Sequence, residues 1–395
     1  MNHTALAYSR GSRTSPETGR GAAPLVQAIV DLDAVAHNTR IIRGIAGGAQ
    51  IMAVVKANGY GHGSAEVART ALDNGASWLA TTTTGDAVAL RAGGVSAPIL
   101  AWLYAPDDGL ADALAARIDV SASSGSALER IASAARREGR AARVHLEADT
   151  GMARGGALAY EWPGLMSAAR ALESGGAIRV VGLWSHFAMA EEPADDGVRQ
   201  LRSFATFRRA AVAAGLTPAF VHIANSAATL RFPQSRFNVV RVGRVLYGDE
   251  PMPGMGLGLR PAMTVTARVL GTSRVPAGTG VSYGWDHVTD RETTLAQISF
   301  GFADGVPRQA TGRACVWLRG RRLPIVGRIT MDQLVVDVGD LPVQPGETVV
   351  MFGPGNRGEP TVQEWAEWAD TNVADILTGI SARVPRRYLP AGPVG

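Results

Sequence analysis

Lysine is almost absent from this sequence. Its 395 residues include 39 lysines and arginines, and of these only Lys56 is a lysine. A bias in base composition explains arginine wherever a generic positive charge suffices. An amine, however, can lose its proton and add to an aldehyde, whereas a guanidinium stays protonated in proteins. Lys56 is therefore a candidate for covalent chemistry that arginine cannot perform.

Cysteine and long apolar runs are scarce as well. Cys315 is the single cysteine, which excludes an intrachain disulfide framework and is compatible with a reducing cytoplasm. No run of about eighteen apolar residues occurs, so the sequence predicts no membrane span. Residues 1–24 are rich in Ser, Thr, Gly and Arg and lack the apolar segment of a secretory signal. We expect a disordered tail there and a cytoplasmic protein.

The excess of positive charge is small, although the isoelectric point near 9.5 raises the question of nucleic-acid binding. The net charge is only +4 and the arginines are scattered along the chain. This pattern favours a solvated basic surface over a nucleic-acid site. The sequence also lacks HExxH and CxxC motifs, clustered carboxylates of metal-ligand spacing, and a Walker A loop. We therefore expect no nucleic-acid partner and no metal site.

Residues 25–254 alternate short apolar runs with helical patterns. Runs of this kind are typical of parallel strands that are covered on both faces. Eight such runs separated by helical segments predict a (β/α)8 barrel of the TIM type. The runs cover residues 52–55, 78–81, 99–103, 118–122, 144–148, 180–185, 221–224 and 239–242.

The pattern of apolar and turn residues changes in residues 255–395. Strand-like runs now alternate with Gly- and Pro-bearing turns, at residues 262–270, 293–300, 314–318 and 334–338. One helix is expected over residues 362–380. The sequence therefore predicts a mostly β C-terminal domain after the barrel.

Reactive side chains follow the predicted barrel strands at the point where each strand ends. In a barrel of this type, the carboxyl ends of the strands and the loops after them form the active-site rim. A lysine, a histidine, two arginines and small polar side chains are therefore expected to converge there. These residues are Lys56, Asp149, Arg154, His186, Asn225, Ser226 and Arg241.

The short motifs around these residues resemble those of the alanine racemases, which are fold-type III pyridoxal-phosphate enzymes. The segment AVVKANGYGHG at residues 53–63 resembles the motif of the family's cofactor lysine. This segment and the further matching motifs occur in the same order along the chain as in the family, which makes a chance match implausible. Further matching strings are DTGMAR (149–154), SHFA (185–188), ANSA (224–227), RVG (241–243), LYG (246–248), VSYG (281–284), MDQ (331–333) and RVPR (383–386).

The resemblance implies a pyridoxal 5'-phosphate cofactor held by Lys56, which is also the base on one face of the substrate's Cα. Tyr283 is implied as the base on the opposite face, supplied by the neighbouring subunit of a homodimer. Two opposed bases invert the centre without moving the substrate. Arg241 is expected to face the pyridine nitrogen, with His186 bridging Arg241 towards Tyr283. The implied substrate is a small amino acid, with alanine favoured.

The remaining contacts are also carried over from the resemblance. A permanent cation at Arg241 resists protonation of the pyridine nitrogen, which keeps negative charge near Cα and favours reprotonation there. The implied cofactor contacts further include Tyr60, Asn225, Ser226 and the amide of Gly243. The implied substrate contacts are Arg154, the backbone amide of Met331, and Asp332.

Four positions depart from the family pattern. Glu147 stands where many members have a carbamylated lysine, and its carboxylate can hold Arg154 without carbon dioxide chemistry. Arg244 occupies a position that is usually apolar, where it is expected either to reach the phosphate or to point to solvent. Phe302 and Ala374 replace two tyrosines, and Ala374 also removes bulk beside the substrate. These departures leave racemisation chemistry intact and bear on selectivity for alanine.

Three alternatives stay open beside an alanine racemase. The first is a racemase of a larger amino acid, such as serine, in a specialised pathway. The second is a fold-type III decarboxylase, which Arg241 and the position of Cys315 in a strand disfavour. The third is a pyridoxal-phosphate carrier protein, which resembles the barrel alone and is disfavoured by the second domain.

Overall fold

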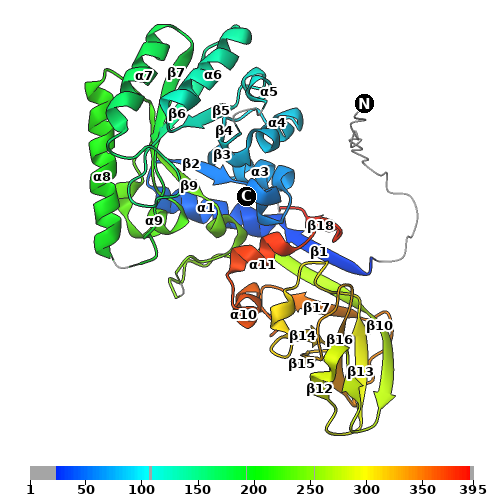
Figure 1. Ribbon diagram of the computed structural model, residues 1–395. Coiled ribbons are helices and arrows are strands. Elements are labelled where there is room, and N and C mark those ends of the chain that lie inside the picture. Colours follow the sequence, from blue (N-terminus) through cyan, green and yellow to red (C-terminus); the bar gives the residue numbers. More distant parts are fainter. Residues whose placement is uncertain (1–23, 106–108, 193, 253, 392–395) are drawn as a thin grey trace, which may run out of the picture.

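The computed structural model of the chain describes residues 24–105, 109–192, 194–252 and 254–391. Figure 1 shows an α/β barrel, coloured blue to green, and a smaller β-rich body, coloured yellow to orange, beside one end of it. Apart from Pro24, the tail expected at residues 1–24 lies outside the described residues.

Parallel strands form the first sheet, which is 8-stranded and has the order β8-β7-β6-β5-β4-β3-β2-β9. The N–H of Arg241 donates to the carbonyl of Ala224 at 3.0 Å, which joins the two end strands and closes the barrel. Every apolar run singled out in the sequence overlaps one of these strands, so the predicted (β/α)8 barrel is confirmed. The strands are β2 (Gln50–Val54), β3 (Ala76–Thr83), β4 (Ile99–Leu103), β5 (Asp119–Ala122), β6 (Ala142–Glu147), β7 (Ile178–Trp184), β8 (Phe220–His222) and β9 (Val239–Val242).

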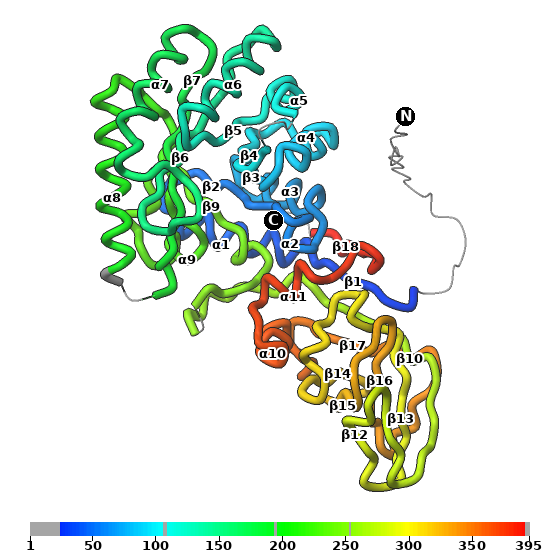
Figure 2. The backbone as a smooth tube through the Cα atoms, in the orientation of Figure 1, coloured from blue at the N-terminus to red at the C-terminus, as the bar shows by residue number. Residues whose placement is uncertain are grey.

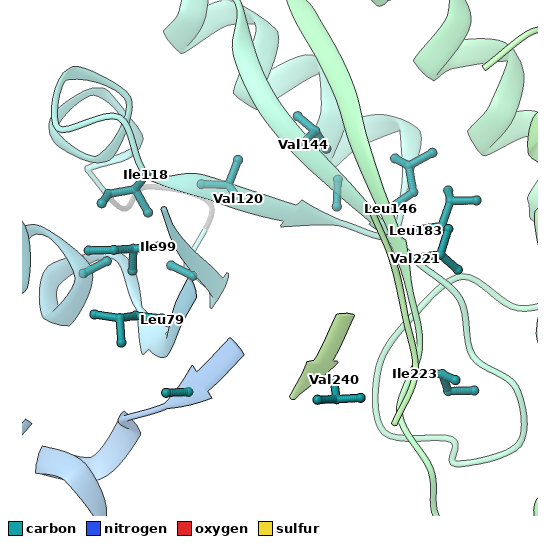
Figure 3. Close-up of a cluster of buried hydrophobic side chains, with 14 of the residues drawn as sticks. Leu79, Ile99, Ile118, Val120, Val144, Leu146, Leu183, Val221, Ile223 and Val240 are labelled. Carbon is teal, nitrogen blue, oxygen red and sulfur yellow. The ribbon is translucent and has the colours of Figure 1, made fainter. Parts of the chain in front are cut away.

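Helices surround the barrel, as the ribbon and the tube both show (Figures 1 and 2). Leu79 of β3, Val144 of β6 and Val240 of β9 belong to the buried apolar cluster of the barrel (Figure 3). No helix among the described residues is long and apolar enough to cross a membrane. The helices are α1 (Leu32–Ala46), α2 (Lys56–Tyr60), α3 (Ser64–Asp73), α4 (Thr84–Ala92), α5 (Leu110–Ala115), α6 (Gly125–Arg137), α7 (Trp162–Ser174), α8 (Ala194–Ala213) and α9 (Ser226–Arg231).

The C-terminal domain is mostly β, as predicted. Its main sheet is 8-stranded, has the order β13-β16-β15-β14-β17-β10-β1-β18, and is largely antiparallel. A separate short hairpin pairs β11 with β12. The strands are β10 (Met263–Val275), β11 (Gly280–Val281), β12 (His287–Val288), β13 (Thr293–Ile298), β14 (Cys315–Leu318), β15 (Arg321–Val326), β16 (Leu334–Gly339), β17 (Thr348–Phe352) and β18 (Arg386–Leu389).

The first strand, β1 (Val26–Asp31), departs from the expectation that residues 25–254 all belong to the barrel. It pairs antiparallel with β10 and parallel with β18, so it is part of the C-terminal sheet. Its buried side chains alternate, with Ala28 and Val30 inside, which is typical of a half-covered strand and not of a barrel strand. Its last residue, Asp31, then caps α1, because Asp31 Oδ1 accepts the N–H of Asp33 at 2.9 Å.

The single helix expected at residues 362–380 is two helices. α10 (Val362–Trp368) ends before Asp370, which has a left-handed φ of 51°. α11 (Val373–Gly379) then begins after Asn372, whose side chain accepts the N–H of Asp375. An asparagine that caps a new helix explains the break, because capping requires non-helical backbone angles at Asn372.

The two domains meet at the glycine-rich loop that follows Lys56. At Gly61, where φ is +81°, an added Cβ would lie 2.2 Å from the carbonyl oxygen of Leu377 in α11. The side chain of Arg386 donates to the carbonyl of Gly61 at 2.9 Å. The glycines of this loop therefore allow the C-terminal segment to pack against the turn that carries Lys56.

This packing predicts that Gly61→Ala destabilises the protein. Left-handed strain costs about 1–3 kcal/mol, and the clash with Leu377 adds to it. We expect the free energy of unfolding, measured with denaturant, to fall by more than about 2 kcal/mol. Gly176→Ala is the matched control, because φ there is +74° but no atom lies within 4 Å of the added Cβ. Equal losses in the two variants would show that the domain contact contributes nothing.

Candidate active site

A cavity of about 720 Å³ opens at the carboxyl end of the barrel strands. Reactive groups of barrel proteins gather at this end. The cavity wall includes the site residues predicted within the barrel domain except Asp149, so the structure brings these residues together. They are Lys56, Tyr60, Glu147, Arg154, His186, Asn225, Ser226, Arg241, Gly243 and Arg244.

Lys56 lies in the wall directly after β2. The residues that follow it, Ala57 and Asn58, have left-handed φ values of 51° and 53°, so the chain turns sharply away from the strand. Burial lowers the pKa of the Lys56 amine, and the positive charges of Arg154 and Arg241 lower it further. The site therefore favours the neutral amine, which is the nucleophilic form.

Arg241 is buried at the back of the cavity, with 4% of its surface exposed. Burial lowers the pKa of its guanidinium to about 9, which the charge of Glu147 partly opposes. The group lies 4.9 Å from the ring centre of Trp184, a favourable position for a cation. Its Nη atoms donate to two carbonyl oxygens, those of Ser185 at 2.7 Å and His222 at 3.1 Å. They also donate to two imidazole nitrogens, Nδ1 of His222 at 3.0 Å and Nδ1 of His186 at 3.1 Å.

His186 is a neutral acceptor for this guanidinium. Burial lowers its pKa well below the usual value, and the charges of Arg241, Arg154 and Lys56 act in the same direction. Because Arg241 can only donate, Nδ1 of His186 accepts and its Nε2 carries the proton. His186 therefore presents one N–H donor that Arg241 does not use.

Small polar groups gather at another part of the wall. The N–H of Gly243 donates to the hydroxyl of Ser226 at 3.1 Å, and an added Cβ at Gly243 would lie 2.6 Å from the hydroxyl of Tyr60. Burial raises the pKa of Tyr60 to about 12, so its hydroxyl keeps its proton. Asn225 caps α9, with its side chain accepting the N–H of Ala228 at 2.9 Å. These groups form a cradle of donors that only glycine at position 243 leaves open.

Arg244 is held by two carboxylates. Its Nε donates to Asp249 at 2.5 Å and its Nη1 to Glu191 at 2.8 Å. The sequence left open whether Arg244 points to a ligand or to solvent. The structure shows a side chain that is fixed at the edge of the cavity by these ion pairs.

Glu147 and Arg154 share the wall on the other side of Lys56. Burial raises the pKa of Glu147 to about 7, against the opposing charges of Arg241 first and Arg154 second. Arg154 is carried by a loop that Asp149 organises, because its carboxylate accepts the N–H groups of Gly151 at 2.7 Å and Ala153 at 2.8 Å. The carboxylate of Glu147 therefore lies in the field of both arginines, whereas the sequence suggested Arg154 alone.

The predicted residues of the C-terminal domain do not line this cavity within the described residues of one chain. Tyr283 is 72% exposed, Met331 56% and Phe302 41%. Asp332 accepts a hydrogen bond from Arg383 at 2.8 Å. Ala374 lies in α11, which packs against α2, the helix of Lys56 and Tyr60.

The sequence missed other residues of the cavity. Trp102 and Trp184 lie at the ends of β4 and β7 and were passed over because they are apolar. His222, which bonds to Arg241, was also missed. A histidine inside an apolar strand run is the signal that could have identified it. Thr82, Glu191 and Glu192 complete the polar part of the wall.

The fold and the cavity together define a two-domain barrel protein that presents one lysine amine, whose pKa is lowered, among arginines. Residues 30–251 match the model of the alanine racemase N-terminal domain, and residues 262–388 match that of the C-terminal domain. An alanine racemase of Frankia casuarinae is 51% identical over 367 residues, which cover 92% of this chain and 96% of that protein. The chain therefore belongs to the alanine racemase family.

Solved structures agree with this assignment. The alanine racemase of Streptomyces lavendulae has a TM-score of 0.92 and 44% identity, covering 94% of this chain and 98% of that one. The alanine racemase of Bartonella henselae, described with covalently bound pyridoxal phosphate, has a TM-score of 0.84 and 27% identity, covering 93% and 100%.

The raised pKa of Glu147 predicts how stability depends on pH. A carboxyl group with a pKa of about 7 in the folded protein, against its usual 4.5, stabilises the fold fully below pH 4.5, and this contribution is lost as pH rises through 7. Glu147→Gln should therefore flatten the fall in stability between pH 5 and pH 8 by on the order of 2 kcal/mol. Denaturant unfolding at both pH values measures the difference. An unchanged pH slope would contradict the assignment, and Glu138→Gln, on an exposed helix end, is the control.

Proposed function

We propose that this chain is a pyridoxal-phosphate-dependent racemase that interconverts L-alanine and D-alanine. The observation that carries the proposal is the position of Lys56, the only lysine of the chain. It lies in the wall of the cavity, where burial and two arginines favour its neutral amine. A neutral amine is what attachment to the cofactor's aldehyde requires. Membership of the alanine racemase family supports the same activity.

The cavity fits this cofactor at three points. The amine of Lys56 suits its aldehyde, and the buried cation of Arg241 suits its pyridine nitrogen, on which a lone pair can accept. The cradle of Tyr60, Ser226 and Gly243 offers hydroxyl and amide donors of the kind that bind phosphate. These groups lie in one wall, which supports a single bound molecule that contacts all of them.

When bound, pyridoxal phosphate withdraws electrons from the substrate's Cα and so acidifies its hydrogen. The neutral amine of Lys56 can take or return a proton on its face of Cα. Arg241 stays a donor and resists protonation of the ring nitrogen, so negative charge stays close to Cα, where a proton can return. The guanidinium of Arg154 is suited to the substrate carboxylate, and Asp149 holds its loop in place.

A second base requires a second chain in this proposal. Tyr283 and Trp285 are 72% and 71% exposed on the C-terminal domain. Met331, the implied substrate contact of the same domain, is 56% exposed. Exposed aromatic groups of this size are typical of surfaces that another subunit covers. We therefore assign Tyr283 of one subunit as the base for the opposite face of Cα in the other subunit's cavity. A homodimer and a cytoplasmic location stay predictions.

The two other pyridoxal-phosphate functions considered have less support. A decarboxylase is expected to place a carboxylate against the pyridine nitrogen, whereas this wall offers Arg241. A carrier protein is expected to consist of the barrel alone, whereas this chain has a complete second domain. A racemase of serine stays open as an alternative, because Ala374 offers only a methyl group on the helix that packs beside Lys56.

Lys56→Arg should abolish racemisation of alanine and the absorption band of bound cofactor, because the chain has no second lysine to replace it. Arginine keeps the positive charge and nearly the length of the side chain, so loss of activity would report the amine itself. Incubation with pyridoxal phosphate and borohydride, followed by mass spectrometry, measures the attachment. A covalent adduct at another residue of the variant would refute the assignment of Lys56.

Mixed dimers test whether two subunits share one active site. Lys56→Arg and Tyr283→Phe subunits, each inactive alone, should recover part of the activity after subunit exchange, since one cavity of the hybrid has both bases. General-base loss in Tyr283→Phe is expected to cost about 10²–10⁴-fold. Complete exchange without recovered activity would contradict the dimeric arrangement.

Ala374→Tyr should raise the ratio of alanine to serine turnover. A ring on α11 fills space next to α2, and pockets reject larger side chains mainly by clash. Ala374→Phe is the matched control, because it adds the ring without the hydroxyl. We expect both variants to improve selectivity and only tyrosine to tighten cofactor binding, by about 0.5–1.5 kcal/mol for one hydrogen bond. An unchanged ratio in both would refute a role of this position in specificity.

A further inference from the structure

A chain of hydrogen-bonded side chains crosses the barrel interior behind Arg241. Nη1 of Arg241 donates to Nδ1 of His222 at 3.0 Å, and Nε2 of His222 lies 2.8 Å from Nδ1 of His145. Nε2 of His145 lies 3.2 Å from Oδ2 of Asp119. The chain ends at Arg143, whose Nε and Nη2 donate to Asp119 at 2.7 Å and 3.0 Å.

The chain connects the cavity with the opposite end of the barrel. Asp119 is the first residue of β5, whereas His222 is the last residue of β8. His145 and His222 are fully buried, and Asp119 is 2% exposed. The side chain of Arg143, at the far end, is 39% exposed. A surface arginine is thus linked to the buried guanidinium through three buried groups.

Only one arrangement of protons satisfies every link of the chain. Arg241 can only donate, so Nδ1 of His222 accepts and its Nε2 carries the proton. That N–H donates to Nδ1 of His145, whose own proton is therefore on Nε2 and points to the carboxylate of Asp119. A carboxylate in an ion pair with Arg143 only accepts. The two ends of the chain therefore determine the tautomer of both histidines.

The barrel is shaped around these two rings. An added Cβ at Gly182 in β7 would lie 2.1 Å from Nδ1 of His145, so only glycine leaves room for the ring. Phe220 stacks on His145 at 6.3 Å between ring centres, and Trp184 stacks on His222 at 6.1 Å. The rings cannot turn freely between these neighbours, which supports a fixed network and not a chance contact.

We propose that Asp119, His145 and His222 are positioning residues that hold Arg241 as a charged donor in one orientation at the cavity wall. The proposal rests on the proposed function only where it gives Arg241 a role towards the cofactor ring. Reversing the tautomers would set an N–H of His222 against an N–H of Arg241. Because burial already lowers the pKa of Arg241 to about 9, loss of an acceptor weakens its hold on the proton further.

The first test observes the tautomers directly and needs no cofactor. In ¹⁵N NMR of the histidine-labelled full chain, His145 and His222 should both be neutral, with the proton on Nε2. Asp119→Asn replaces the charged, acceptor-only carboxylate by an amide that also carries a donor group, so the nitrogen signals of His222 should move although the substitution is one histidine away. Nδ1–H tautomers in the wild type, or a His222 signal unaffected by Asp119→Asn, would refute the network.

A milder variant, Arg143→Gln, tests the same network in case Asp119→Asn does not fold. Arg143→Gln changes only the partly exposed end of the chain and removes the cation that pairs with Asp119. It should shift the signals of His145 in the same direction as Asp119→Asn and by a smaller amount. Signals of His145 that match the wild type in this variant would also overturn the proposal.

The second test measures the effect on the loaded enzyme. His145→Phe keeps an aromatic ring between Phe220 and Trp78 but breaks the chain. We expect kcat for alanine to fall about 10–100-fold, the range known for outer partners of metal ligands, with a smaller change in KM. The pH titration of the bound cofactor's absorption band should also move.

Thr81→Val is the control for lost stability. It removes a different, partly buried barrel hydrogen bond, from Oγ1 of Thr81 to the carbonyl of Thr83 at 3.0 Å, and should leave the cofactor's pH titration unchanged. If His145→Phe behaves like Thr81→Val, the chain has no positioning role. If the wild type binds no cofactor while the NMR test succeeds, the proposed function fails and the network stands.

Discussion

The buried positive charge of Arg241 is the constraint on which the rest of the site depends. Taking a guanidinium out of water costs several kcal/mol unless its donors are satisfied and its charge is compensated. Carbonyl groups at the ends of β7 and β8 accept its N–H groups, and two histidines accept more. The barrel is needed for this arrangement, because only a closed sheet brings the ends of β7, β8 and β9 around one side chain.

The same charge sets the protonation of its neighbours. Near Arg241 and Arg154, an ammonium at Lys56 and an imidazolium at His186 are both disfavoured. Glu147 is the one group whose ionisation these cations favour, and burial still raises its pKa to about 7. Burial is the largest cause of the lowered pKa of both Lys56 and His186, and the charges of Arg154 and Arg241 act in the same direction. The two arginines oppose the effect of burial only at Glu147, whose carboxylate balances part of their charge.

The sequence predicted the parts of this structure that depend on local pattern. Each barrel strand is a short apolar run, and the rule that reactive groups follow strand ends identified Lys56, His186 and Arg241 together. Residues 26–31 were assigned to the barrel domain, although they form β1 of the C-terminal sheet, because the partners of β1, which are β10 and β18, come from the far end of the chain. The buried histidine chain was missed because its links depend on strand register, which no local pattern reveals. Gly182 was missed for the same reason, because glycine is required there only by the ring of His145, which lies on another strand.

The scarcity of lysine and the carboxylate at position 147 have a common consequence for the site. A carbamylated lysine near Arg154 would require a second amine beside a site that is proposed to bind an aldehyde, and that amine could compete with Lys56. Glutamate supplies a carboxylate without carbon dioxide chemistry and cannot add to a carbonyl group. With arginine at every other basic position, the chain has one side-chain amine, so covalent attachment is restricted to one place. Selectivity for that attachment then comes from composition as much as from geometry.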